Sequence, residues 1–267
     1  MLLSQRLIST LRASGGGGGG MLEIGPGPTT GQYDATTDTG YYGEVSAAEL
    51  ITGAALASGI GLGAGTAMAD AGWLKFYVGP NADCNRGSMA YVLFVAKMPL
   101  RYGLSWDQIN TAHPVNGSGA QITIGADSYK VRLLTGADAD PSTYSATAAG
   151  TNCAQNPGAG SEWNDLLYRI HVDAPNCAEP TVGMPGGSEA SRHGGPQVGA
   201  NWAALTDAET GPLFTLNSGN ASWCQEVDGV ATSRCVYRGY YGVATFGTLT
   251  MGTQAYTGWR PALELVG

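Results

Sequence analysis

Glycine is the feature that most constrains this chain, because 42 of its 267 residues are glycine while only 13% carry a charged side chain. Glycine destabilises helix interiors and is the usual residue of tight turns. The scarcity of Lys and Glu also removes the exposed helix faces of a typical helical protein. Since 43% of the residues are apolar, a core can still form. We therefore expect short strands joined by many loops, and not a helical bundle.

The first twenty residues differ in character from the rest of the chain. Four apolar residues recur at helical spacing and predict a short helix with one apolar stripe: Leu3, Leu7, Ile8 and Leu11. A helix of about three turns is marginal alone and needs a partner surface. Gly15 to Gly20 follow as a flexible tether. Residues 1–20 are thus expected to anchor the chain to a partner; the alternative is a disordered N-terminus with chance apolar content.

Charge and hydropathy exclude several classes of protein. Arg6 and Arg12 interrupt the apolar start, so it lacks the continuous apolar region of a signal peptide. No later segment approaches the about 18 uninterrupted apolar residues of a membrane span, so no membrane insertion is expected. The formal net charge is −8, without a local run of Lys or Arg. This balance argues against nucleic-acid binding.

Hydrophobic periodicity and capping residues predict the elements of secondary structure. Apolar and alternating runs indicate strands at 73–78, 90–95, 121–124 and 129–134, with short strands near 235–238 and 260–266. Capping serines indicate helices at 46–57, 105–110 and 161–170, the last ending at His171. The glycine-rich stretch 59–65 lacks a Lys-Ser/Thr pair, so it predicts a loop that ends a helix and not a phosphate-binding loop.

Motifs in the second part of the chain occur in a fixed order. They are Met98-Pro-Leu-Arg-Tyr-Gly-Leu-Ser-Trp-Asp107, Tyr129-Lys-Val-Arg-Leu-Leu-Thr135 with Glu162-Trp163, Asn220-Ala-Ser-Trp-Cys-Gln-Glu226, and Arg234-Cys-Val-Tyr-Arg-Gly239 with Gly258-Trp-Arg-Pro-Ala-Leu263. This series resembles the formylglycine-generating-enzyme-like superfamily, whose Tyr-Arg-Leu-Pro-Thr…Glu-Trp signature is split here by an insertion. The resemblance implies an α+β, C-type-lectin-like fold of loop-rich small antiparallel sheets with two or three short helices.

A second resemblance covers nearly the whole chain. The N-terminal segment and glycine tract, Gly40-Tyr-Tyr-Gly-Glu44, Trp73-Leu-Lys-Phe76 and Ser105-Trp-Asp-Gln-Ile-Asn110 follow the order seen in uncharacterised phage structural proteins of the tail or fibre type. It implies a virion component, made in the host cytoplasm and placed on the particle exterior. The expected divisions are an anchor and linker at 1–20, a β-containing segment at 21–89 packed on the main domain, and a C-type-lectin-like domain at 90–267.

Two interpretations of the cysteines, as disulfides or as free thiols, stay open. In a particle outside cells, Cys153 with Cys177 and Cys224 with Cys235 are possible disulfides, and buried free thiols are the equal alternative. Cys84 would be left over. The oxidases of the superfamily use cysteines near their terminal motifs, but here no cysteine follows Cys235. Because the thiol chemistry then has no agent, we expect no enzymatic activity and no cofactor.

A metal is not expected either. The cysteines and histidines lack the spacing of a zinc site. Asp138, Asp140 and Asp165 are the candidate oxygen ligands for calcium, but their spacing matches no known calcium loop.

Aromatic residues concentrate in the last third of the chain, including Trp202, Trp223, Tyr237 and Trp259. Residues 239–256 mix aromatics with Gly, Thr and Gln, a composition typical of an adaptable recognition loop. The residues expected to contact a ligand are Tyr240, Tyr241, Phe246 and Tyr256. Side chains expected instead to be structural are Trp106, Trp163, Trp223, Trp259, Arg132, Arg238 and Arg260.

Together these features predict a phage tail-fibre or head/tail-tip component that binds a host surface glycan or protein through C-terminal aromatic loops. Its N-terminal segment would contact other virion proteins, and a homo-oligomer, with a trimer favoured, is expected. The alternative is a purely architectural collar, baseplate or capsid decoration protein without a host ligand.

Overall fold

The computed structural model describes most of the chain from residue 24 onward. The described residues are 24–118, 120–137, 140, 160–172, 199–202, 204–210, 221–229, 231–239 and 246–266. The predicted anchor and linker at 1–20 lie outside this set. So do Cys153, Cys177, Asp138, Tyr240 and Tyr241.

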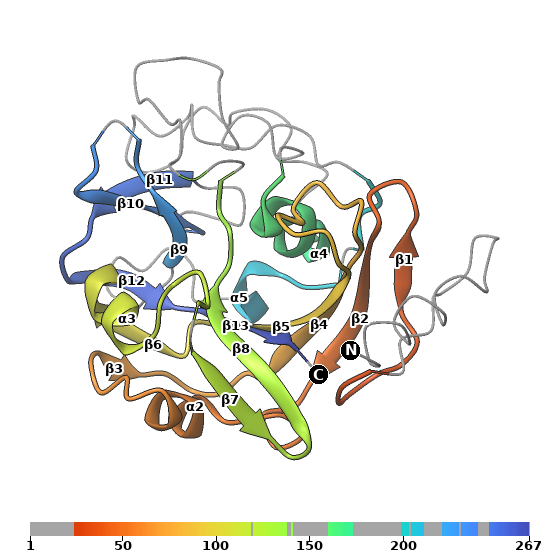
Figure 1. Ribbon diagram of the computed structural model, residues 1–267, viewed down its shortest axis with the longest axis horizontal. Coiled ribbons are helices and arrows are strands. Elements are labelled where there is room, and N and C mark those ends of the chain that lie inside the picture. The colour runs from red at the N-terminus through yellow and green to blue at the C-terminus, as the bar shows by residue number, and fades with distance from the viewer. Residues whose placement is uncertain are drawn as a thin grey trace.

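A seven-stranded antiparallel sheet forms the centre of the fold (Figure 1). Its strands, in spatial order, are β1 (Gln32–Asp34), β2 (Thr39–Val45), β4 (Trp73–Val78), β5 (Tyr91–Ala96), β13 (Pro261–Leu265), β8 (Asp127–Leu133) and β7 (Gln121–Ile124). The last strand in sequence, β13, lies between β5 and β8. Residues more than a hundred positions apart along the chain are therefore neighbours in the middle of this sheet.

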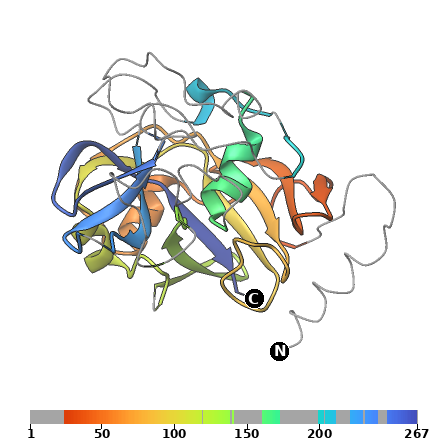
Figure 2. The same ribbon diagram turned by 90° about the horizontal axis from the view of Figure 1, so that it is seen from above.

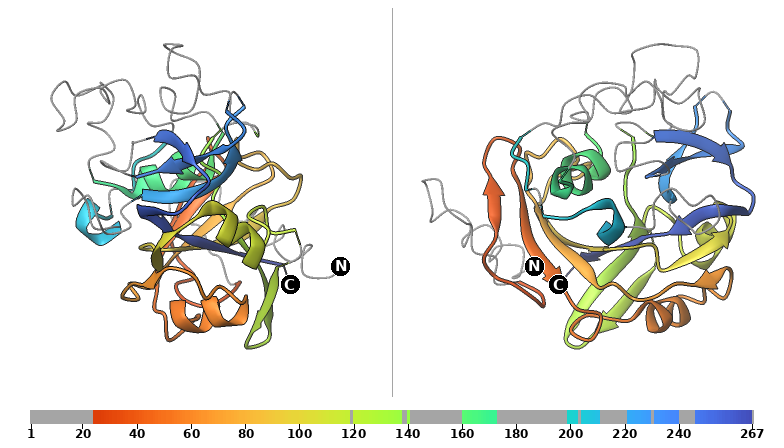
Figure 3. Two further views of the ribbon diagram at one scale, coloured as in Figure 1. Left: turned by 90° about the vertical axis from the view of Figure 1, so that its left-hand side faces the viewer. Right: turned by 180° about the vertical axis from the view of Figure 1, so that it is seen from behind.

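A second, six-stranded sheet lies beside the first (Figure 1). Its order is β11 (Phe246–Thr250), β10 (Arg234–Arg238), β9 (Ala221–Val227), β12 (Gln254–Trp259), β6 (Arg101–Leu104) and β3 (Thr66–Ala67). Only β12 and β9 pair in parallel among these described strands. The turned views show the two sheets at an angle to one another, with β12 running directly into β13 (Figures 2 and 3).

The helices within the described residues are few and short. They are α2 (Gly53–Gly59), α3 (Trp106–Ala112), a π-helix η1 (Trp163–Leu167), α4 (Tyr168–Ile170) and α5 (Asp207–Thr210). Ser105 and Gln108 form a reciprocal capping box at the start of α3, as expected from the sequence. The segment formed by η1 and α4 is buried on every side, and not on one face alone. It ends at His171, as predicted.

The side-chain alternation of the central strands builds two hydrophobic clusters. On β5, Val92 and Phe94 enter one cluster, while Leu93 and Val95 enter the other. The first cluster joins the two sheets to α2 and α3. The second lies on the opposite face of the seven-stranded sheet, where η1 and α4 cover it (Figure 1). Because both faces are covered, the central strands are apolar on both sides.

Most of the predicted elements are confirmed, with one helix wrong. Strands occur at 73–78, 91–96, 121–124, 127–133, 234–238 and 261–265. The helix expected at 46–57 is not continuous. Ser46 and Glu49 make their capping hydrogen bonds around a single turn, and the helix begins only at Gly53, capped by Thr52. As predicted, the glycine-rich stretch after it ends this helix, and Gly61 and Gly65 have positive φ.

The expected division at residue 89 runs through a single sheet. β4 precedes it and β5 follows it, and the two strands pair from Trp73–Ala96 to Val78–Tyr91. The observed architecture is thus an α+β arrangement of small, mostly antiparallel sheets with few short helices.

Cys224 and Cys235 are free thiols, so the disulfide alternative for this pair is wrong. They lie on adjacent strands, but Cys235 is opposite Val227 and Tyr237 is opposite Trp223. As a result Cys224 points into one hydrophobic cluster and Cys235 into the other. Side chains on opposite faces of a sheet cannot be bridged without moving the backbone. Cys84 is also free and buried.

Candidate binding cavity

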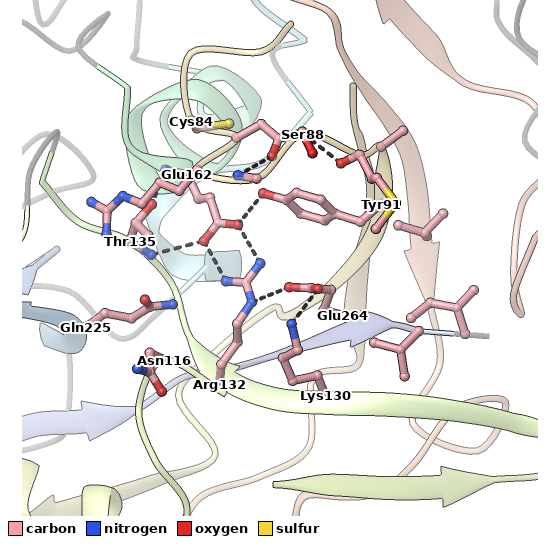
Figure 4. A pocket seen from close by; sticks show the side chains of 18 of the residues that line it. Cys84, Ser88, Tyr91, Asn116, Lys130, Arg132, Thr135, Glu162, Gln225 and Glu264 are labelled. Atoms are coloured by element: carbon pink, nitrogen blue, oxygen red, sulfur yellow. Dashed lines mark hydrogen bonds and ion pairs between the residues drawn. The ribbon is translucent and has the colours of Figure 1, made fainter. Parts of the chain in front are cut away.

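A cavity of about 550 Å³ lies where β5 begins and β13 ends (Figure 4). The cavity is lined by the loop before β5, by Tyr91 and Val92 at the start of β5, by Asp127, Lys130 and Arg132 of β8, and by Glu264 and Leu265 of β13. Its volume is in the range of about 300–1,000 Å³ typical of small-molecule sites.

Strand alternation places the charged side chains of the cavity. In β8, Tyr129, Val131 and Leu133 enter the first hydrophobic cluster. Lys130 and Arg132 therefore point to the opposite face, into the cavity. Glu264 on β13 is directly opposite Lys130 in the strand pairing. Its carboxylate accepts hydrogen bonds from Lys130 Nζ at 2.9 Å and from Arg132 Nε at 2.8 Å (Figure 4).

Glu162, at the start of η1, completes the floor of the cavity. Both terminal guanidinium nitrogens of Arg132 donate to it, at 2.7 and 2.6 Å. The hydroxyl of Tyr91 donates at 2.8 Å and the amide of Thr135 at 3.0 Å (Figure 4). The amide of Glu162 in turn donates to the Thr135 hydroxyl at 2.8 Å. This bidentate, fully hydrogen-bonded pair fixes the side-chain positions at the cavity floor.

Burial and charge act in opposite directions on these groups. Burial disfavours the ionised form of Glu162, but Arg132 and the hydrogen bonds outweigh it, so the pKa of Glu162 lies below its ordinary value. Burial and the nearby Glu162 carboxylate raise the pKa of Tyr91 well above its ordinary value. The floor thus consists of an ionised carboxylate, a guanidinium and a neutral phenol.

A second ion pair lies at one side of the cavity. Arg86 donates to Glu226 Oε1 at 2.7 Å and to the carbonyl of Ala137 at 2.6 Å. Glu226 is fully buried and also accepts from the amide of Gly136 at 2.9 Å. Burial raises the pKa of Glu226 to about 7, although Arg86 opposes the shift.

Cys84 lines the cavity beside a buried carboxyl, Asp165. Burial, followed by the charges of Asp165 and Glu162, raises the pKa of the Cys84 thiol well above its ordinary value. Burial also raises the pKa of Asp165 to about 7. Since the thiolate is the reactive form of cysteine, this environment keeps Cys84 in its unreactive thiol form.

The rim of the cavity is apolar on one side. Of the three large hydrophobic side chains that are exposed in the described part of the chain, two lie here: Met89, which is 69% exposed, and Val266, which is 42% exposed. Ile24 and Leu265 adjoin them. Asn116, Lys130 and Gln225 line another part of the same cavity (Figure 4). The cavity therefore presents an apolar part and a hydrogen-bonding part to an incoming ligand.

Of the four predicted ligand-contacting residues, only Tyr256 has a described side chain, and it does not line this cavity. Tyr240 and Tyr241 lie outside the described residues. Phe246 begins β11, and its side chain is not among the described ones. Tyr256 lies within β12 and is half-buried, so the segment predicted to be a loop through residue 256 contains two paired strands instead. Of the other aromatics in the last third, Trp202 and Tyr237 are buried, as are Trp223 and Trp259, which were expected to be structural.

The side chains expected to be structural are confirmed as such. Trp106, Trp163, Trp223 and Trp259 are buried. Arg238 donates to the carbonyl of Gly136 and to Asn164, and Arg260 donates to Ser222.

Sequence reasoning missed Tyr91, Lys130 and Glu264. The alternation Tyr129-Lys-Val-Arg-Leu133 was the available signal, because it puts two cations on one face of a strand that also contributes to the core.

Among the described residues, no group of three or more His, Cys, Asp or Glu side chains is arranged to hold a metal ion. Of the aspartates considered for calcium, Asp165 is buried, and Asp140 accepts a hydrogen bond from the amide of Val227. No described helix has the length and apolar character needed to cross a membrane. The chain matches no known family, no curated protein and no solved structure.

Proposed function

We propose that this protein is a non-catalytic component of a phage particle that binds the host surface through a C-type-lectin-like domain. Residues 1–20 would attach it to other virion proteins, and the folded part would carry the binding site on the particle exterior. A homo-oligomer, with a trimer favoured, fits an anchoring helix too short to stand alone.

The two halves of the split motif support the C-type-lectin-like part of this proposal. Thr135 ends the first half and Glu162 begins the second, 27 positions later. In the fold each donates a backbone amide hydrogen bond to the side chain of the other. The insertion therefore leaves the motif continuous in space, with Arg132 and Glu162 joined by a 2.6 Å ion pair.

The observation that carries the binding function is the preformed cavity. Its floor is rigid because Arg132, Glu162 and Glu264 satisfy one another. A site whose polar groups are held in place before the ligand arrives costs less ordering entropy on binding. The aromatic segment that includes Tyr240 and Tyr241 remains the second candidate contact region of the same proposal.

Binding of the labelled full-length chain to a panel of bacteria and to their envelope extracts tests this function. We expect saturable binding to at least one strain, which Lys130→Met or the Tyr240→Ala/Tyr241→Ala double variant reduces. Lys97→Met is the matched control, because Lys97 also pairs with a carboxylate, Glu44, but lies outside the cavity. Absence of binding to every strain, together with loss of particle incorporation on deleting residues 1–20, would refute host recognition.

One observation favours the architectural alternative. The exposed Met89 and Val266 adjoin Ile24, the first described residue after the expected anchor. Exposed apolar side chains grouped in this way are typical of protein contacts. If Met89→Glu abolishes particle incorporation while host binding is absent in the parent protein, the cavity rim is a contact between virion subunits.

A further inference from the structure

We infer that the cavity takes an uncharged, hydroxyl-rich ring, the chemistry of a neutral hexose unit, and does so without a metal ion. This inference rests on the proposed binding function and specifies the ligand class. Three properties of the cavity support it: the pairing of its charges, its remaining hydrogen-bonding capacity and its apolar rim.

Each cation among the described residues of the cavity is paired with a carboxylate. Arg132 contacts Glu162 and Glu264, and Lys130 contacts Glu264. Arg86, which also lines the cavity, is paired with Glu226, which does not line it. Counting Asp127, which also lines the cavity, the carboxylates equal or outnumber the three cations. A phosphate or carboxylate ligand would therefore meet no unbalanced positive charge, and its desolvation would be uncompensated.

Hydrogen-bonding capacity remains on both the donor and the acceptor side. Lys130 uses one of its three donors on Glu264. Asn116 accepts from the amide of Ser118 through its side-chain oxygen, which leaves its NH₂ group for a ligand. Gln225 donates to the carbonyl of Leu133, which leaves its side-chain oxygen as an acceptor. A hydroxyl group is both donor and acceptor, so it can satisfy these neighbours together.

The apolar rim gives the complementary surface. Met89, Leu265 and Val266 line the cavity together with these polar groups. A neutral sugar ring has hydroxyl groups around its edge and C–H groups on its faces. It can thus satisfy the polar part of the cavity while it covers exposed apolar surface, which contributes about 25 cal/mol per Å² removed from water. A purely apolar ligand would leave Lys130 and Gln225 unsatisfied, at a cost of about 1–3 kcal/mol for each group.

Ligand-observed NMR with the full-length chain tests the inference. The probes are the methyl glycosides of glucose, galactose and mannose and of N-acetylglucosamine, each in chelator-treated buffer, with glucuronic acid and glucose 6-phosphate as charged analogues. We expect saturable, millimolar binding of at least one neutral glycoside, weaker binding of the charged analogues, and a loss of roughly tenfold on removing one hydrogen-bonding group.

The variants locate the binding. Lys130→Met and Asn116→Ala should weaken it, whereas Lys97→Met should leave it unchanged. Tighter binding of a charged analogue, a requirement for calcium, equal binding by Lys130→Met, or no binding of any neutral glycoside overturns the inference. If none of the glycosides binds but the chain still attaches to bacteria, the ligand class is wrong and the proposed function stands. If it attaches to no bacteria and incorporates only through residues 1–20, the proposed function fails independently.

Discussion

The buried Arg132–Glu162 pair gives the sharpest test of how the cavity floor is held together. Replacing Glu162 by Gln keeps the side-chain shape but removes the charge that faces Arg132, whose exposed fraction is only 4%. Breaking a buried ion pair from one side costs about 3–5 kcal/mol, because a charge is left without its partner. Since Glu264 still contacts Arg132 at 2.8 Å, we expect the lower end, about 3 kcal/mol.

Urea and thermal unfolding measure this cost. For a protein of this size, about 3 kcal/mol corresponds to a fall in Tm of about 6–12 °C. The double variant Glu162→Gln/Arg132→Met removes both charges. Its loss of unfolding free energy should therefore be about 2 kcal/mol smaller than the sum of the losses of the two single variants.

Glu44→Gln is the matched control for the same chemical change. Glu44 pairs with Lys97 at 2.8 Å, but its side chain is 46% exposed. Exposed pairs contribute about 0–1 kcal/mol. If Glu162→Gln costs no more than Glu44→Gln, or if the double variant is strictly additive, the pair does not hold the cavity floor.

Further tests concern pH, backbone packing and thiols. Asp165→Asn should raise the free energy of unfolding at pH 8. The fold raises the pKa of Asp165 to about 7, and each unit by which the folded pKa exceeds the unfolded pKa makes the ionised carboxyl cost about 1.4 kcal/mol of stability. The variant's advantage should shrink as pH falls from about 7 to about 4 and vanish only below about pH 4, where the unfolded wild type also binds the proton; a pH-independent difference contradicts it. Gly31→Ala, whose Cβ would lie 2.4 Å from the Tyr41 carbonyl oxygen, should cost about 1–3 kcal/mol in a urea titration, whereas the unobstructed Gly63→Ala should cost almost nothing. A thiol reagent should label Cys84, Cys224 and Cys235 only on unfolding, without added reductant; failure of any of these three to react after unfolding contradicts the free-thiol state.

Strands with continuous apolar character could be predicted from the sequence. Residues 73–78 match β4 at both ends, because aromatic and branched residues follow one another and glycine follows at residue 79. The same segment shows a limit of the pattern. Lys75 within it is fully buried, and its ammonium group donates to the carbonyls of Gly25 and Pro28. Burial lowers its pKa to about 8. A sequence pattern does not reveal which distant carbonyls will accept from such a lysine.

Glycine-rich strands could not be predicted. β2 contains Gly40 and Gly43, and its pairing with β4 shifts at a bulge between Tyr41 and Gly43. Gly43 has a φ of 103°, a conformation that side chains beyond glycine rarely adopt. Read locally, such a segment has the composition of a loop. It is a strand because its neighbours supply backbone partners and because Tyr42 enters the hydrophobic core.

A local signal can also be correct and still mislead. Ser46 and Glu49 form the predicted capping hydrogen bonds, but the chain does not continue as a helix. Instead, the carbonyl of Ile51 accepts a hydrogen bond from the indole N–H of Trp73 at 2.8 Å. That contact joins positions 22 apart in the sequence, so tertiary structure overrides the helix start that the capping box signals.

The cavity illustrates the same limit for function. Its walls come from the loop before β5, from β8, from the start of η1, from β9 and from β13, which are distant in sequence and meet only because β13 inserts between β5 and β8. No local motif contains the site, so the aromatic composition near the C-terminus was the stronger signal in the sequence. The same origin couples the cavity to the stability of the whole fold, because unfolding any one of these segments removes a wall. Loss of binding in a variant is therefore informative only at a temperature where variant and control are equally folded, and Lys130→Met and Lys97→Met should be compared at such a temperature.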